Sequence, residues 1–438
     1  SLRNHLFFPT PIILLGFLVL LTSCTGLVEH NSGNRNQAER QTISLINSYT
    51  VPPFVSPPDS IQSVQLYSGQ PGEPPIVKLG SGSLTLEFDF LGRYVPPFTV
   101  RISHRQPDWQ ESAMGKNRYM GNYFEDNIIT AKASDTEPPQ YQHYEYTFPN
   151  RDFRFTKSGN YLLELYSLNN SRLIFRIPFM VYEDVGSIST EVDVLYNQTR
   201  DGRSLHQPFT TYIYEELEAS DPEFYLSYYY MPYNYWGRAR KVEIYDVVKT
   251  DRVNFHLSRD RSFKGNQSFM NLDLEDPSMQ KRRIMGIEHE YIPRRVILKR
   301  DIIGLDTSPQ SFSYGSYGQP AQSIRSAYWD VRFTLDPGIE LRPNSRVFLV
   351  GDFNNWSLDP AQQLTLNTNS GEWHGRALIK EGRYNYRYVT LTGQEVNDLD
   401  LDNAFSRNMA NYTALVYYND PDAFYQRLVQ VQQFKVRD

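Results

Sequence analysis

Apolar and polar residues alternate with a period of two through much of the chain. Residues 84–90 read LTLEFDF, and the same alternation recurs at 98–102, 161–165 and 173–181. Alternate side chains of a β-strand point to opposite faces, so this period indicates strands with one face in a core. Turn-forming sequences such as GSGS and TKSGN separate the repeats. The pattern predicts an N-terminal β-sandwich over residues 43–184.

A second run of short strands lies near the C-terminus and predicts an early-set-like β-sandwich over residues 326–438. Residues 185–325 give a weaker pattern and are interpreted as a middle β-rich domain, with a Ser/Gly/Pro-rich stretch at 307–323 as a linker or long loop. The predicted class is all-β, with tandem immunoglobulin-like or early-set β-sandwich domains. The strands expected in the C-terminal domain span 329–335, 346–350, 373–379, 384–389 and 413–418.

Composition agrees with this class. The chain has 438 residues, enough for about two to four domains. Its 32 Tyr, 25 Phe, 27 Pro and 25 Gly favour short strands joined by turns. A net charge of −6 argues against nucleic-acid binding, because contact with phosphates needs a basic surface. The single cysteine removes intrachain disulfides and cysteine-based metal clusters.

That cysteine, Cys24, follows a segment laid out like a secretory signal. A short polar start precedes the apolar residues 6–21, and the sequence LTSC at 21–24 resembles a bacterial lipobox. We therefore expect residues 1–23 to be a lipoprotein signal peptide and Cys24 to be acylated, which would anchor the protein to a membrane. An ordinary signal peptide with an incidental cysteine is the alternative. Residues 24–42 are polar and aperiodic, so they are expected to form a flexible tether that holds the body at the periplasmic face of the outer membrane.

Two stretches of the middle region are candidates for partner binding. Residues 224–236 hold eight aromatic residues, and they form either a recognition surface or a half-buried sheet face. Residues 281–300 are rich in Lys and Arg, and they form either a docking patch for an acidic partner or a solvated strand face. The partner-binding candidates are Tyr228, Tyr230, Trp236, Arg282, Arg283, Arg294 and Arg295.

The sequence GDFNNW at 351–356 resembles a motif of early-set modules that bind glycogen or starch. In those modules two exposed tryptophans stack on sugar rings, and a basic residue and an asparagine bind hydroxyl groups. The resemblance makes Asn355, Trp356 and Arg387 glycan-binding candidates. Glu395 stands where the second tryptophan would be, and a carboxylate has no ring to stack on a sugar. The motif is therefore interpreted mainly as a turn of the sandwich.

No catalytic motif is complete. His289-Glu290 begins a metalloprotease-like pattern, but residue 293 is proline where the second histidine would be. Three aspartates alternate at 398–402 without the glycine and distal glutamate of a calcium loop. The eight histidines are scattered singly. His104 with Asp108 and His143 with Glu145 are either acid–base pairs or satisfied strand residues, and the second interpretation is preferred. We expect no enzyme activity, no cofactor and no metal.

Several ordered motifs together resemble the plug protein family of the type IX secretion system. They include SHRQPDWQES at 103–112, YQHYEYTFPN at 141–150, SGNYLLELY at 158–166 and VFLVGDFNNW at 347–356. The resemblance implies a non-enzymatic subunit that closes the periplasmic opening of a large outer-membrane translocon barrel, which would be its protein partner. A glycan-binding outer-membrane lipoprotein that uses the C-terminal sandwich is the alternative.

Overall fold

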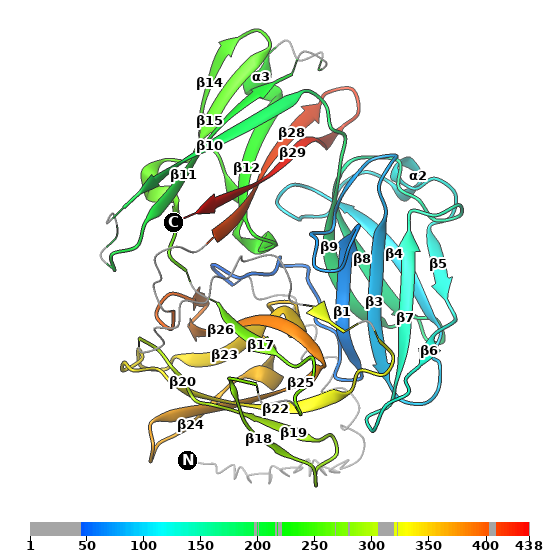
Figure 1. Cartoon of the computed structure of the whole chain (residues 1–438). Helices are drawn as coiled ribbons and strands as arrows, with labels where there is room; N and C mark the ends of the chain where they lie inside the picture. The colour runs from blue at the N-terminus through cyan, green and yellow to red at the C-terminus, as the bar shows by residue number, and fades with distance from the viewer. Residues whose placement is uncertain are drawn as a thin grey trace, which may run out of the picture.

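The computed structural model describes residues 45–437, apart from 197–198, 200, 215–216, 218–220, 268, 279–280, 305–318, 322 and 403–408. Nearly all of its regular structure is β-strand, which confirms the predicted all-β class. The strands form three blocks, here called the first sandwich, the upper block and the lower block (Figure 1).

The first sandwich packs two sheets face to face around an aromatic core, and their strands are antiparallel apart from one parallel pair, residues 76–78 with 180–182. Phe88 stacks on Tyr144 at 4.8 Å and meets Phe98 edge to face at 5.4 Å. All four predicted strands of this region are present. One sheet contains β1 (Ile61–Ser68), β3 (Leu84–Leu91), β7 (Tyr141–Phe148) and β6 (Lys132–Ala133); the other contains β2 (Ile76–Lys78), β9 (Leu173–Tyr182), β8 (Gly159–Ser167), β4 (Phe98–Arg105) and β5 (Glu125–Ile128), with helix α2 (Lys116–Tyr119) beside it.

The upper block combines strands from the middle of the chain with its last two strands (Figure 1). Its core contains Tyr228 stacked on Phe255 at 4.4 Å. One sheet contains β10 (Ser187–Leu195), β11 (Leu205–Ile213), β15 (Arg252–His256), β14 (Ile244–Lys249) and β16 (Phe263–Lys264); the other contains β13 (Arg240–Lys241), β12 (Leu226–Pro232), β28 (Met409–Asp420) and β29 (Tyr425–Arg437). Helix α3 (Pro222–Tyr225) lies between β11 and β12, and the 3-10 turns η1 (Trp236–Arg238) and η2 (Arg259–Arg261) lie between strands of the same sheet.

The lower block is a second pair of sheets, with Phe333 packed edge to face on Tyr386 at 5.3 Å. One sheet contains β17 (Met270–Asp273), β26 (Gly382–Thr392), β21 (Gln319–Pro320), β23 (Arg346–Gly351) and β27 (Glu395–Asn397); the other contains β18 (Ile284–Glu288), β19 (Arg295–Leu298), β20 (Asp301–Ile302), β22 (Tyr328–Asp336), β25 (Glu372–Lys380) and β24 (Thr365–Asn367). The turns η3 (Asp352–Asn354) and η4 (Pro360–Gln362) lie between strands.

The sheets cross the predicted division at residue 325. Strand β17, from the predicted middle domain, pairs with β26 of the lower block, and β28 pairs with β12 of the upper block. The strand expected at 413–418 is therefore present as part of β28, but it does not belong to the sandwich that holds the other predicted C-terminal strands. Alternation along one segment identifies a strand and carries no information about its partner.

His104, on β4, is buried in the first sandwich where this sandwich meets β29. Its Nε2 lies 3.0 Å from the main-chain oxygen of Ser158, and its ring contacts Tyr161 and Tyr425. Its Nδ1 is buried and has no hydrogen-bond partner in the described residues. Burial lowers the pKa of the imidazole from the usual 6.5 to about 4. The folded protein therefore holds His104 neutral, as a strand histidine with a hydrogen bond at only one of its two ring nitrogens.

We expect His104 to make the protein less stable in mild acid. Between pH 6.5 and pH 4 the unfolded chain binds a proton that the folded protein excludes, so stability falls as the pH falls. For one such group the loss between pH 7 and pH 5 is about 2 kcal/mol. Urea unfolding midpoints of the wild type and His104→Gln, measured at both pH values, will check this, because the variant should lose less stability on acidification.

The matched control is His289→Gln, which makes the same substitution at an exposed histidine. It should keep the pH dependence of the wild type. Equal pH dependence in wild type and His104→Gln would contradict the assignment.

Candidate functional site

The aromatic stretch of the middle region lies inside the protein. Tyr228 and Tyr230 are on β12 and are 1% and 0% exposed. Tyr230 shares a 2.6 Å hydrogen bond with Thr210 and donates to the main-chain oxygen of Phe255. Trp236, 8% exposed, packs edge to face on Trp109 of the first sandwich at 5.8 Å. The structure therefore places all three candidates in cores, and their contacts are internal.

The basic stretch is largely neutralised by carboxylates of the protein itself. Arg283 pairs with Asp301, and Arg295 lies 3.2 Å from Asp330. Arg294 lies 3.1 Å from Glu137 of the first sandwich and covers the ring of Trp329. The side chain of Arg282 is exposed. Arg294 thus contributes to a contact between blocks, a role that the sequence pattern alone did not indicate.

The GDFNNW segment forms a turn whose polar groups bond inside the protein. Trp356 is half-buried, with its ring near Tyr49 and Tyr235, and its Nε1 donates to Asp352 at 3.0 Å. Asn355 donates to the main-chain oxygen of Val64 at 3.0 Å. These residues line a cavity of about 170 Å³ where the first sandwich, the lower block and the segment after β12 of the upper block meet.

Arg387 also lies away from solvent. Its side chain is 2% exposed and bonds to Asp398 at 3.1 Å and Asp402 at 3.0 Å. A buried guanidinium with two carboxylate partners is not available to sugar hydroxyls. The three glycan candidates therefore do not form an open platform in the structure.

Buried polar contacts join the three blocks pairwise, and the first of these junctions is centred on Asp89. Asp89 is on β3, and its carboxylate is fully buried. It accepts hydrogen bonds from Lys380 at 2.8 Å and from Tyr328 at 2.6 Å, both in the lower block. His143 of the first sandwich lies 2.7 Å from its other oxygen. Because a buried charge is costly unless paired, these contacts fix the lower block against the first sandwich.

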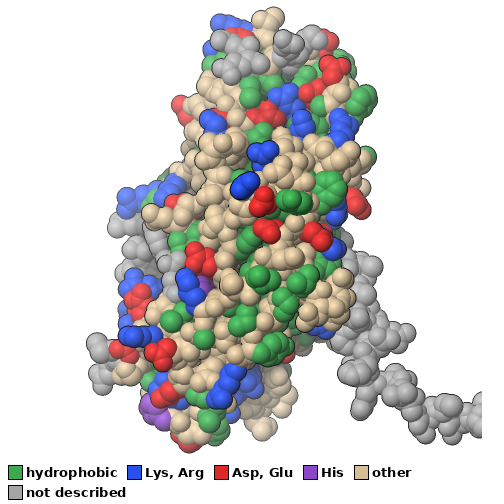
Figure 2. Space-filling model, turned by 90° about the vertical axis from the view of Figure 1, so that its right-hand side faces the viewer, with side chains coloured by type: hydrophobic (Ala, Val, Ile, Leu, Met, Phe, Trp, Pro, Cys, Tyr) green, Lys and Arg blue, Asp and Glu red, His purple; other side chains and the backbone are tan. Residues whose placement is uncertain are grey.

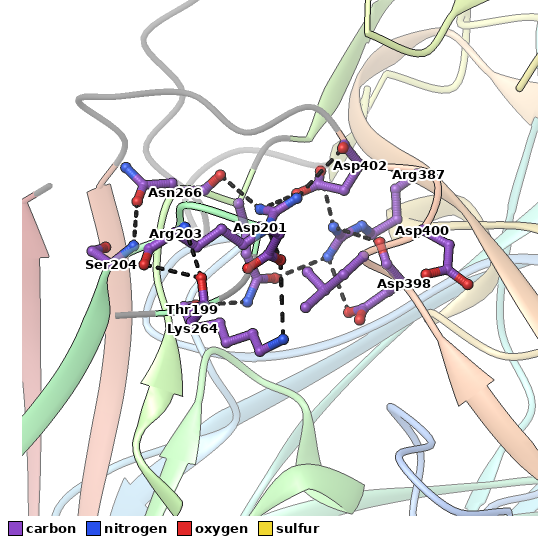
Figure 3. A network of polar contacts seen from close by, with 12 residues as sticks. Thr199, Asp201, Arg203, Ser204, Lys264, Asn266, Arg387, Asp398, Asp400 and Asp402 are labelled. Carbon is purple, nitrogen blue, oxygen red and sulfur yellow. Dashed lines mark hydrogen bonds and ion pairs between the residues drawn. The ribbon is translucent and has the colours of Figure 1, made fainter. Parts of the chain in front are cut away.

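The second junction joins the upper and lower blocks through alternating arginines and aspartates (Figure 3). Arg203, just before β11, lies 2.8 Å from Asp402, which also pairs with Arg387. Arg387 reaches Asp398, and Asp398 in turn accepts from Arg238 at 2.6 Å. Burial would raise the pKa of Asp398, but the guanidiniums of Arg238 and Arg387 hold it well below its usual range.

The third junction joins the first sandwich to the upper block. Arg427 on β29 donates hydrogen bonds from two guanidinium nitrogens to the carboxylate of Glu183, at 2.9 and 2.6 Å. Tyr417 of β28 donates to Asn160 of β8 at 2.7 Å. A separate hydrophobic cluster fills the space between the two blocks, and it contains Val51, Ile76, Trp109, Leu162, Met180, Met231, Trp236, Leu415, Tyr417 and Leu428.

The first sandwich has exposed apolar side chains at one end, and the sequence analysis did not single them out. Phe98 pairs with both Ile128 and Ser167, so the residues just beyond these positions meet at this end. Four apolar residues at this end lie just before β4, just after β5 or just after β8. They are Tyr94, Val95, Ile129 and Leu168, which are 66%, 41%, 64% and 41% exposed. We call these four residues the apolar end. Figure 2 shows the side of the molecule that carries the first sandwich, where hydrophobic side chains lie among charged ones.

The described residues offer neither a metal site nor a membrane-spanning helix. They contain no group of three or more His, Cys, Asp or Glu side chains arranged to hold a metal ion. No helix within them is long and apolar enough to cross a membrane. Cys24, the predicted acylation site, lies outside the part of the chain that the structure describes.

Comparison with known proteins gives one family match. Residues 61–183 match the family model of the type 9 secretion system plug protein first domain. The predicted resemblance to the plug family is thereby confirmed for the first sandwich. The match associates the protein with type IX secretion and with a family of secretion components. A type IX association also indicates a location related to the cell envelope.

A solved structure supports the whole architecture. A hypothetical protein from Parabacteroides merdae is similar over 87% of this chain and 99% of its own, with a TM-score of 0.77 and 21% identity. The C-terminal domain of the Streptococcus pyogenes antigen I/II-family protein AspA reaches a TM-score of only 0.17 at 7% identity, with 85% and 99% of the two chains covered. The search of curated proteins found no match. The first comparison shows a shared fold.

We expect Lys380→Met to destabilise the joint between the first sandwich and the lower block. The variant leaves the buried Asp89 carboxylate without its ammonium partner, and removing one partner of a buried pair costs about 3–5 kcal/mol. Urea unfolding of the wild type and the variant will measure the loss. Arg325→Gln is the control, because Arg325 and its partner Asp135 are exposed and such pairs contribute less than about 1 kcal/mol.

A double variant tests whether the loss of stability in Lys380→Met comes from breaking the ion pair between Lys380 and Asp89. Asp89→Asn combined with Lys380→Met should cost less than the sum of the two single changes, since no unpaired charge remains. A loss below that of Arg325→Gln in the single Lys380→Met variant would contradict the role given to this ion pair.

Proposed function

We propose that this protein is a non-enzymatic plug subunit that closes the periplasmic opening of the large outer-membrane translocon barrel of the type IX secretion system. The observation that carries the proposal is the match of residues 61–183 to the plug protein first domain. Closing a pore requires surface contacts with a barrel and requires no reacting group. The incomplete catalytic motifs of the sequence agree with such a role.

The three junctions support the proposal on physical grounds. A body that blocks a wide opening must not deform when the barrel or its cargo presses on it. Asp89 with Lys380, Arg238 with Asp398, and Arg427 with Glu183 each join two different blocks through short ionic contacts. Each block is thus held against both of the others, so that none hinges freely.

We further propose that acylated Cys24 and the tether at 24–42 keep the plug at the periplasmic face of the outer membrane. A protein held near its target by a short flexible tether reaches an effective concentration of about the millimolar range. Closure would then depend less on how much plug the cell makes. Mass spectrometry of the acyl groups on Cys24 tests this part separately.

We propose the apolar end of the first sandwich as a contact surface for the translocon. It belongs to the domain that matches the plug family, and its side chains Tyr94 and Ile129 are among the most exposed large apolar groups of that domain. Exposed apolar groups that lie together commonly mark interaction sites. This surface replaces Tyr228, Tyr230 and Trp236 as our candidate, because those side chains are buried. Arg282 is exposed and stays an additional contact candidate.

No observation favours the glycan-binding alternative. Trp356 is half-buried against Tyr49 and Tyr235, and Arg387 is buried with two aspartates. A sugar platform would need both side chains to be accessible. We therefore make no second proposal.

The proposal predicts that the full chain, tagged at its C-terminus and extracted from outer membranes in mild detergent, co-purifies with a very large β-barrel at a near-equal ratio. Quantitative mass spectrometry of the purified material measures this ratio. The double variant Tyr94→Ser, Ile129→Ser should reduce the recovered barrel by about tenfold or more, because buried apolar anchors dominate protein interfaces.

The control is Ile339→Ser, which removes an apolar side chain that is 53% exposed on the lower block. It should recover as much barrel as the wild type. Recovery of the wild-type chain without any translocon-sized barrel would refute the plug proposal. Unchanged recovery with the double variant would refute only the contact surface.

A further inference from the structure

A polar cavity of about 530 Å³ lies at the junction of the upper and lower blocks. Arg238 and Arg240 line it from the segment after β12, Arg261 and Lys264 from η2 and β16, and Asp398 from the segment after β27. It is larger than the 170 Å³ cavity beside Trp356. The residue types that line it suggest a ligand with negative charge.

The acidic side chains of this cavity are mostly engaged or exposed. Asp398 accepts hydrogen bonds from Arg238, Arg387 and Tyr49, at 2.6, 3.1 and 2.8 Å. Asp260 and Glu395 are exposed. Hydrogen bonding to Ser258 in its own turn lowers the pKa of Asp260. Four basic side chains therefore face three carboxylates, of which the buried one is already bound by two guanidiniums.

Arg240 is the basic residue that lacks a counter-charge. Its Nη1 donates to two main-chain oxygens, those of Arg261 and Ser262, and its guanidinium lies 4.2 Å from the centre of the Phe263 ring. No carboxylate forms an ion pair with it in the described part of the chain. Burial lowers the pKa of Arg240 to about 10, and the charges of Arg238 and Arg261 add to this effect while Tyr412 and Asp398 oppose it.

The neighbours of Arg240 could adjust to an incoming anion. Arg261 pairs with Glu243, but the Glu243 side chain is 75% exposed, so the pair contributes little and exchanges easily with solvent. Lys264 is 46% exposed and lies 4.0 Å from Asp201. Two basic side chains thus stand beside Arg240 with weak existing partners.

We propose that this cavity binds a small oxyanion of the phosphate or carboxylate type, with Arg240 as its principal contact and with Arg261 and Lys264 completing the site. A guanidinium presents its N–H groups in a planar fork that matches two oxygens of either group. Main-chain hydrogen bonds and the Phe263 ring hold this fork in place before the anion arrives. The anion supplies the counter-charge that the protein does not provide.

The site joins η2 and β16 of the upper block to the segment around Arg240, next to the contact with the lower block. An anion held there would bridge these segments and stabilise the folded protein against heat, since it binds only the folded form. This inference is independent of the plug proposal.

The test measures binding and stability in the full chain purified in mild detergent. Isothermal titration calorimetry with inorganic phosphate and with acetate, at ionic strength kept constant with sodium chloride, should give saturable binding of one anion per chain for at least one of them. At saturating anion the melting temperature should rise by about 3 °C. The two probes distinguish a phosphate from a carboxylate ligand.

Arg240→Gln should weaken binding by about tenfold or more, the usual loss for a charge-assisted hydrogen bond. If this variant does not fold, the more exposed Arg261→Gln and Lys264→Gln carry the test, and each should weaken binding by about threefold or more. Arg325→Gln changes the charge by the same amount outside the cavity and should bind like the wild type. Absence of saturable binding for both anions, or equal binding by wild type and the cavity variants, would overturn the proposal.

Discussion

The arrangement of the blocks depends on one buried carboxylate. Asp89 is fully buried in a protein interior, where an ionised group without partners costs several kcal/mol. The first sandwich supplies His143 as a neighbour, but the ammonium and the phenol come from Lys380 and Tyr328 of the lower block. Separating or rotating these blocks would remove Asp89 from its donors. The relative position of the blocks is therefore set by electrostatics as well as by apolar packing.

The other two junctions extend this constraint to the whole body. The alternating arginines and aspartates bind the upper block to the lower block, and Arg427 with Glu183 binds the upper block to the first sandwich. Three blocks joined pairwise form a closed triangle, in which a movement at one junction strains the other two. Chain topology adds to the effect, because the chain passes from β27 in the lower block to β28, which pairs with β12 in the upper block. Stiffness of this kind suits a subunit whose proposed task is to obstruct an opening.

Period-two alternation predicted the strands well because it is a local property. It did not predict which strands pair with each other or which side chains are buried, because both depend on residues far apart in the sequence. The polar residues of β3 alternate with its core residues, and the pattern gave no sign that Asp89 and Glu87 are only 0% and 5% exposed, because the lower block and Tyr67 cover them. Similarly, the aromatic stretch had two interpretations that sequence could not separate, and burial of Tyr230 selects the interior one. The candidate apolar end was missed since its residues come from separate turns.

The alternating ladder also explains why Arg240 stands apart. In the ladder, Asp402 lies between Arg203 and Arg387, and Asp398 lies between Arg387 and Arg238, so each carboxylate already binds two guanidiniums. Arg240 is close enough to Arg238 for that charge to lower the pKa of Arg240, but the Asp398 carboxylate is already hydrogen-bonded to Arg238. The three guanidiniums of the ladder thus already share its two carboxylates, and neither carboxylate is left to form an ion pair with Arg240. An anion bound in the adjoining polar cavity would supply that charge.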